Sequence, residues 1–250
     1  MDDELISFKN VSKTFGKKVV LDSVSFSIPE NKITGIIGAS GEGKTTLLKL
    51  IVDFYKPTSG EVSYSKRSIA QDSRNIKNIF GFATEDGSFH DQLTVYENIM
   101  HFGMLHHVPR KELKRRIEET LGIVGLSEAR HFLARNLSMG MKKRLDVAIS
   151  WIHNPKVLIM DEPTADLDPL LRSHMLDLIR KINQQGTTII LTTQLLGEMD
   201  KVCDKIAILF DKKIVEAGTP SDIKTKYGSR ELDDVFNKIF SQQRSDQKGI

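Results

Sequence analysis

A glycine-rich loop between a buried strand and a helix constrains this 250-residue chain more than any other feature. The loop reads Gly38-x-x-x-x-Gly43-Lys44-Thr45, and it follows an apolar run over residues 33–37 that predicts a central strand covered on both faces. Such a loop surrounds phosphates with backbone N–H groups, while its lysine reaches the β- and γ-phosphates of a nucleotide and its threonine hydroxyl ligates magnesium. We therefore predict a phosphate site made by the loop and the first helical residues: Gly38, Ala39, Ser40, Gly41, Glu42, Gly43, Lys44, Thr45 and Thr46.

A second predicted strand ends in two acidic residues. Four apolar residues, Val157 to Met160, indicate a buried strand, and Asp161 and Glu162 follow at its carboxyl end. In an open parallel sheet, ligands bind at that edge. An acidic pair after a strand is, by itself, more often a solvated strand end. Because the phosphate loop lies upstream, we predict instead that Asp161 holds magnesium, directly or through water, and that Glu162 polarises the attacking water.

Composition and charge exclude several classes of protein. The 36 basic and 33 acidic residues leave a net charge of +3, which is too small to indicate a nucleic-acid partner. No apolar run exceeds five residues, whereas a membrane-spanning helix needs about twenty. Cys203 is the single cysteine, so an intrachain disulfide is excluded, and the amino end is acidic, unlike a signal peptide. We expect a soluble α/β protein of the cytoplasm.

Hydrophobic periodicity predicts strands in both halves of the chain. Residues 24–28 and 62–64 alternate between apolar and polar side chains, as half-buried strands do. After Pro155, short apolar runs alternate with helical segments. This order is typical of βαβ units and favours a mostly parallel sheet.

Helices are expected in the middle and at the end. Over residues 88–153, Thr94 and Ser138 can cap helices and Pro109 opens a basic one, whose positive face we interpret as solvated rather than phosphate-binding. An apolar stripe near the end predicts a helix that packs back onto the domain, with a partner interface as the alternative. The stripe consists of Leu232, Val235, Phe236, Ile239 and Phe240. Residues 241–250 are polar and predict a frayed end.

Two further segments make the chain resemble a known family. Residues 136–145 read NLSMGMKKRL, and residues 161–169 read DEPTADLDP. Together with the loop at residues 38–45, their order and spacing resemble the nucleotide-binding domain of ATP-binding cassette (ABC) proteins, from about residue 5 to 225. The segments Gly218-Thr219-Pro220 and 232–236 are similar to the exporter-type branch that serves drug and polysaccharide permeases.

The resemblance implies a fold and a division of the chain. It implies a P-loop NTPase core of the RecA-like α/β type, with a mostly parallel sheet, within an ABC ATPase domain over residues 1–228. An antiparallel β subdomain would take up about residues 1–30 and 60–80, and an inserted helical subdomain about residues 88–153. A C-terminal helix and frayed tail would follow over residues 229–250. ATP and Mg²⁺ are then the implied ligands.

The resemblance also implies roles for single residues. Phe15 matches the aromatic residue that stacks on adenine, although a core aromatic at a strand end is the alternative. Ser138 and Gly140 match the signature segment, which in the family touches the γ-phosphate held by a second subunit. Residues 165–168 match the loop that crosses the dimer interface. These matches imply two ATP molecules between two such domains, in a homodimer or a heterodimer.

Three positions depart from the family pattern. Glu85 stands where the family has a glutamine that senses magnesium, and Gln194 stands where it has a switch histidine. Met139 replaces the first glycine of the signature pair. Glu85 can still bind magnesium but adds negative charge near the γ-phosphate, and Gln194 donates a hydrogen bond but is neutral. The departures predict intact ATP binding and slow hydrolysis.

These observations predict an ATP-hydrolysing subunit that energises export through a separate transmembrane permease. The chain would reach the membrane only through that permease, at its cytoplasmic side, and it would bind no nucleic acid. One alternative is a soluble ABC protein of translation or DNA repair. Another is a regulatory module that binds ATP and scarcely hydrolyses it.

Overall fold

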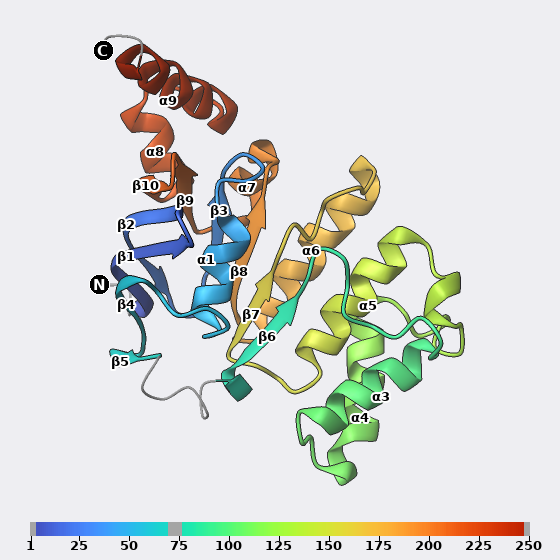
Figure 1. The fold of residues 1–250 in the computed structure, drawn as a ribbon. Coiled ribbons are helices and arrows are strands. Elements are labelled where there is room, and N and C mark those ends of the chain that lie inside the picture. The colour runs from blue at the N-terminus through green and yellow to red at the C-terminus, as the bar shows by residue number, and fades with distance from the viewer. Residues whose placement is uncertain (1–3, 70–76, 248–250) are drawn as a thin grey trace.

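The computed structural model describes residues 4–69 and 77–247, which form two β-sheets and the helices around them (Figure 1). Parts of the predicted β subdomain, residues 1–3 and 70–76, and the last residues of the predicted tail, 248–250, lie outside the described residues. No helix within the described ranges is long and apolar enough to cross a membrane.

The larger sheet has six strands in the order β10-β9-β3-β8-β7-β6. The five strands from β9 to β6 run parallel to one another, and β10 pairs antiparallel with β9. The mostly parallel sheet predicted from the sequence is therefore confirmed, whereas the antiparallel edge strand was not anticipated. The strands are β3 (Ile33–Ile37), β6 (Phe80–Ala83), β7 (Val157–Met160), β8 (Thr188–Thr193), β9 (Lys205–Phe210) and β10 (Lys213–Gly218).

Both faces of this sheet are covered. Along β7, Leu158 and Met160 point into one apolar cluster, whereas Val157 and Ile159 point into another. The first cluster contains α5 (Met139–Trp151), α6 (Pro169–Gln184) and α7 (Leu196–Val202), and the second contains α1 (Lys44–Ile51) and the smaller sheet. Because side chains alternate along a strand, a run without polar residues requires apolar partners on both sides.

The smaller sheet is antiparallel over its described residues and has the strand order β2-β1-β4-β5. It contains the strands that the alternating patterns predicted. Residues 77–79 form a 3₁₀ turn, and Phe80 already belongs to β6 of the larger sheet. The strands are β1 (Glu4–Phe15), β2 (Lys18–Pro29), β4 (Ser59–Tyr64) and β5 (Arg67–Ser68).

Helices lie beyond each edge of the larger sheet (Figure 1). Beyond β6 are α3 (Val95–Leu105), α4 (Arg110–Val124), the 3₁₀ turn at Ala134–Asn136, and α5. Thr94 caps α3 and Ser138 caps α5, as the sequence predicted, because each side chain accepts a backbone N–H of the first turn. Pro109 directly precedes α4. The described part of residues 88–153 is thus helical with short connections.

At the opposite edge, α8 (Pro220–Lys226) and α9 (Leu232–Gln247) follow β10 (Figure 1). Leu232, Val235 and Ile239 are buried in the same cluster as α7, so the apolar stripe packs back onto the domain as predicted. Phe240 contacts Phe210 of β9 with a ring-centre distance of 4.3 Å. Of the segment 241–250 predicted to be frayed, the residues up to Gln247 belong to α9, and the remainder lies outside the described residues.

Candidate functional site

The glycine-rich loop joins β3 to α1 at the carboxyl edge of the parallel strands. Gly38 packs against the backbone of β9, where an added Cβ would lie 2.6 Å from the carbonyl oxygen of Leu209. Gly41 and Gly43 have φ values of 83° and 106°, a backbone region that glycine adopts without strain. Gly43 is also the N-cap residue of α1. The first N–H groups of a helix have no partner within the helix, so they remain available for an anion.

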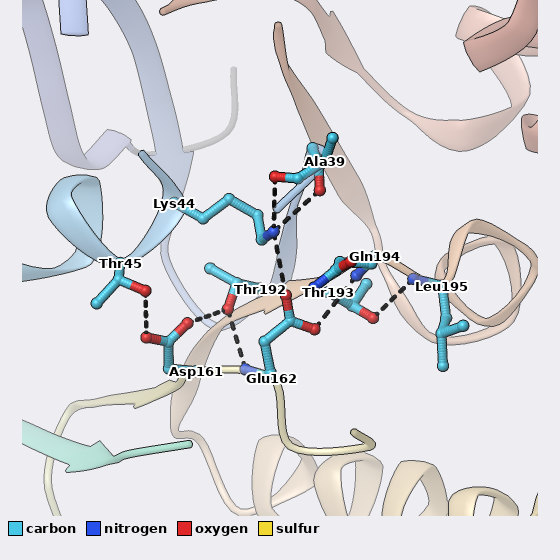
Figure 2. Close-up of polar contacts among 10 residues, drawn as sticks. Ala39, Lys44, Thr45, Asp161, Glu162, Thr192, Thr193, Gln194 and Leu195 are labelled. Atoms are coloured by element: carbon cyan, nitrogen blue, oxygen red, sulfur yellow. Dashed lines mark hydrogen bonds and ion pairs between the residues drawn. The ribbon is translucent and has the colours of Figure 1, made fainter. Parts of the chain in front are cut away.

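Lys44 lies inside this loop with 6% of its surface exposed. Its Nζ donates hydrogen bonds to the carbonyl oxygens of Gly38 and Ala39, at 2.9 Å and 3.2 Å. The same nitrogen lies 3.1 Å from Oε1 of Glu162, and both side chains are buried (Figure 2). The lysine and the acidic residue that the sequence assigned to the reaction are therefore in direct contact.

Asp161 joins the loop to the ends of β7 and β8. Its Oδ2 accepts a hydrogen bond of 2.7 Å from the hydroxyl of Thr45, and its Oδ1 accepts one of 2.5 Å from the hydroxyl of Thr192 (Figure 2). Its backbone N–H donates to the carbonyl oxygen of Ala83 at 2.9 Å, which ties it to β6. The carboxylate is thus held beside the threonine hydroxyl that was predicted to ligate magnesium.

Glu162 has a φ of 49°, an uncommon conformation for a residue other than glycine. Two contacts to the end of β8 stabilise it. Its backbone N–H donates to the Thr192 hydroxyl at 3.0 Å, and its Oε2 accepts the backbone N–H of Gln194 at 3.2 Å (Figure 2). Among the described residues, its buried Oε1 pairs with Lys44 but accepts no hydrogen bond, which leaves that oxygen able to accept one from water.

A cleft of about 370 Å³ opens over these groups. Its lining includes most of the predicted loop residues together with Phe15, Glu85, Glu162 and Gln194. Phe15 lies at the mouth, 40% exposed, with its ring edge against Tyr55 at a centre distance of 5.0 Å. The ring is therefore partly exposed within the cleft lining. The complete lining is Phe15, Lys18, Val20, Ser40, Gly41, Gly43, Lys44, Thr45, Thr46, Glu85, Glu162 and Gln194.

The signature segment is not part of this cleft. Ser138, Met139 and Gly140 are at the start of α5 and are not among the residues that line this cleft. Ser138 is exposed and caps the helix, and Met139 has 52% of its surface exposed. Glu42 is also not among the residues that line the cleft, and its Oε2 accepts the backbone N–H of Lys212 at 3.5 Å. A single chain therefore brings the loop, Asp161, Glu162, Glu85 and Gln194 together, but not the signature segment.

Comparison with known proteins identifies the family. The model of the ABC transporter family matches residues 21–165, from the second strand through the strand that ends in Asp161 and Glu162. This match covers more than half of the chain. The chain belongs to the ABC transporter family.

Individual relatives agree with this assignment. The linearmycin resistance ATP-binding protein LnrL of Bacillus subtilis is 30% identical over 90% of this chain and 72% of its own length. The methionine import ATP-binding protein MetN of Mannheimia succiniciproducens is 35% identical over 88% of this chain and 66% of its own length. A solved ATP-binding subunit of an ABC transporter has a TM-score of 0.84 at 26% identity, covering 94% of this chain and 99% of that one. This chain is an ATP-binding subunit of an ABC transporter.

The residues of this ABC transporter subunit suit ATP with magnesium. Thr45 and Asp161 offer the hard oxygen ligands that Mg²⁺ prefers, and Glu85 lies in the same cleft. No cluster of three or more metal-binding side chains occurs in the part of the chain that the structure describes. Magnesium is usually bound through one or two protein carboxylates and the phosphates of the substrate. Lys44 is bonded to two loop carbonyls and Glu162, and its ammonium group lines the same cleft.

Three residues of the site were not predicted from the sequence. Thr192 links Asp161 to Glu162, and Lys143 and Asp146 of α5 contact the segment that carries Glu85. A polar residue at the carboxyl end of a buried strand was the available signal for Thr192. For Lys143 and Asp146, the available signal was a pair of charged residues on one face of α5. That face is buried in the structure.

Proposed function

We propose that this chain hydrolyses ATP and thereby energises export through a separate transmembrane permease. The observation that carries the proposal is the buried pair of Lys44 and Glu162 at 3.1 Å, beside Asp161 and Thr45 at 2.7 Å, in one cleft. A phosphate-binding cation, a magnesium ligand pair and a carboxylate base are the parts that phosphoryl transfer to water requires. An ATP-binding protein without hydrolysis would not need the base.

In this proposal each side chain has one task. Lys44 leaves the carbonyl oxygens of Gly38 and Ala39 and binds the β- and γ-phosphates. Thr45 and Asp161 would hold magnesium with Glu85, and that metal would supply positive charge beside the phosphates. Glu162 accepts the proton of the attacking water through Oε1, while the Thr192 hydroxyl holds its backbone N–H and the backbone N–H of Gln194 holds its carboxylate. Phe15 stacks on the adenine, and Gln194 donates to the γ-phosphate.

A second subunit completes the site. Because Ser138 and Gly140 do not line the cleft of their own chain, we infer that they reach the phosphates of a second copy or a related subunit. ATP would then favour the closed pair, since only the closed pair makes these contacts, and hydrolysis would reopen it. The ATPase domain would comprise residues 1–228 with its β and helical subdomains, and residues 229–250 would form a C-terminal extension of it.

Export is favoured by the relative LnrL, named as a linearmycin resistance protein, and by the exporter-like segments at residues 218–220 and 232–236. Import is the second candidate, because MetN is named as a methionine import protein. In either case the chain would work at the cytoplasmic face of the membrane, held there by the permease. Neither a nucleic-acid partner nor a membrane segment of its own enters the proposal.

Genetic deletion separates these functions. Removing the gene for this chain should make cells more sensitive to antibiotics, and returning the intact gene should restore tolerance. A new requirement for an external nutrient would indicate import instead. If the purified chain releases no phosphate from ATP, alone or with its permease, the proposed hydrolysis is wrong.

Turnover should rise when the switch position receives a histidine. The backbone N–H of Gln194 holds Glu162, so Gln194→His keeps that contact and changes only the exposed side chain. A hydrogen bond to a charged group contributes about 1.5 to 3 kcal/mol and a neutral one about 0.5 to 1.5 kcal/mol, so the gain of about 1 to 2 kcal/mol corresponds to roughly five- to thirty-fold in rate. Adding Glu85→Gln should raise the rate further by removing a repelling carboxylate.

Steady-state phosphate release from the single and double variants measures this effect. The two sites face the same phosphate, so their gains need not add. Unchanged or lower rates in both variants would mean that Gln194 does not limit turnover and that its neighbours have adapted to it.

A further inference from the structure

Two charged residues of α5 contact the segments that carry the reactive side chains. Lys143 is buried, and its Nζ donates a hydrogen bond of 2.7 Å to the carbonyl oxygen of Glu85. The same nitrogen also donates a hydrogen bond of 3.5 Å to the carbonyl oxygen of Glu162. One ammonium group therefore links the helix to both the candidate magnesium ligand and the candidate base.

Asp146 lies one turn further along the same face of α5. Only 2% of its surface is exposed, and its Oδ1 accepts the backbone N–H of Ser88 at 2.6 Å. Ser88 belongs to the loop that follows β6 and includes Glu85. Burial raises the pKa of Asp146 to about 6, and the Ser88 N–H and the nearby ammonium of Lys143 oppose that rise. The two side chains thus bind one loop at Glu85 and Ser88, which are three positions apart.

Because Lys143 and Asp146 are buried, breaking their hydrogen bonds would be energetically costly. An ammonium or carboxylate group that loses its hydrogen-bond partners inside a protein pays a large desolvation cost. The loop and the backbone of Glu162 must therefore follow α5 when the helix moves. Ser138, the residue expected to touch the phosphate of a second subunit, caps this same helix five residues before Lys143.

We propose that Lys143 and Asp146 are positioning residues that attach the loop of Glu85 and the backbone of Glu162 to the helix that carries Ser138. The inference rests on the proposed function, because it assigns these contacts to hydrolysis. Docking of Ser138 on a phosphate would then orient the magnesium ligand and the base of its own chain. Neither residue touches the nucleotide.

Lys143→Met tests the first contact. ATP affinity should stay within about two-fold, since the phosphate loop is untouched, whereas turnover should fall by about ten-fold or more, as when a supporting hydrogen bond is lost. The magnesium concentration for half-maximal turnover should rise, because Glu85 is released. Lys143→Gln, which still donates a hydrogen bond, should recover part of both losses.

Ser150→Ala is the matched control. Ser150 is also a buried residue of α5. Its hydroxyl donates a hydrogen bond of 2.8 Å to the carbonyl oxygen of Phe82, which belongs to β6 and lies outside the loop. This variant should lose thermal stability and keep its turnover and its magnesium dependence. If Lys143→Met and Ser150→Ala change turnover alike at similar losses of stability, the contacts are merely structural and the inference is overturned.

Amide hydrogen exchange tests the second contact without any hydrolysis. Asp146→Leu should speed exchange of the Ser88 amide by about ten-fold or more, because its acceptor is gone. Asp146→Asn retains a carbonyl oxygen and should restore protection. Unchanged exchange in Asp146→Leu would contradict the proposed attachment. A parent protein that binds ATP but releases no phosphate would instead refute the proposed function, while the exchange result would still decide whether the loop is attached to α5.

Discussion

Glu162→Gln is expected to bind ATP about as tightly as the parent protein and to hydrolyse it about a thousand-fold more slowly, within the range that a general base contributes. The amide fills the same volume and can still accept the backbone N–H of Gln194, which lies 3.2 Å from Oε2. It cannot accept a proton from water. The loss should therefore appear in kcat, with little change in the dissociation constant for ATP.

The same variant should also reveal the paired state. If reopening requires hydrolysis, subunits with ATP and magnesium bound should accumulate as dimers in size-exclusion chromatography. Glu119→Gln, an exposed change on α4, is the control and should behave as the parent does. A Glu162→Gln protein that turns over ATP at the parental rate would remove Glu162 from the role of base.

Lys44→Ala is expected to weaken ATP binding by about a hundred-fold, because a charged hydrogen bond to phosphate contributes about 1.5 to 3 kcal/mol. Backbone N–H groups of the loop would remain and account for the residual affinity. Isothermal titration with ATP and magnesium measures the effect directly. Lys49→Ala removes a lysine from the last turn of the same helix and should leave the affinity unchanged.

The stability of the ligand-free protein provides a second measurement. In Lys44→Ala, Glu162 remains buried without its cation, and losing one partner of a buried ion pair costs about 3 to 5 kcal/mol. Adding Glu162→Gln should restore most of that free energy of unfolding, since the uncompensated charge is then gone. Equal stabilities of the single and double variants would mean that the pair at 3.1 Å is not coupled in solution.

Local patterns in the sequence were enough to predict the elements that carry the site. The loop at residues 38–45 lies between β3 and α1 because its glycines permit positive φ values and its neighbours are apolar. Asp161 and Glu162 follow β7, and Thr94 and Ser138 cap their helices, as their types and positions indicated. Each of these features depends on residues only a few positions apart, so each can be recognised from the sequence alone.

The tertiary structure decided which of these residues meet. Thr45 and Asp161 are 116 positions apart, and Lys143 reaches Glu85 over 58. No local pattern records such pairings, because they follow from the order in which strands assemble and from the burial of the groups between them. Burial then determines the partners, since a charged group removed from water requires a specific hydrogen-bonding neighbour. The sequence alone therefore determined the motifs and the strands and helices that present them. Packing of the sheet against α5 brought Lys143 and Asp146 to the site, and pairing of β7 with β8 brought Thr192 to Asp161 and Glu162.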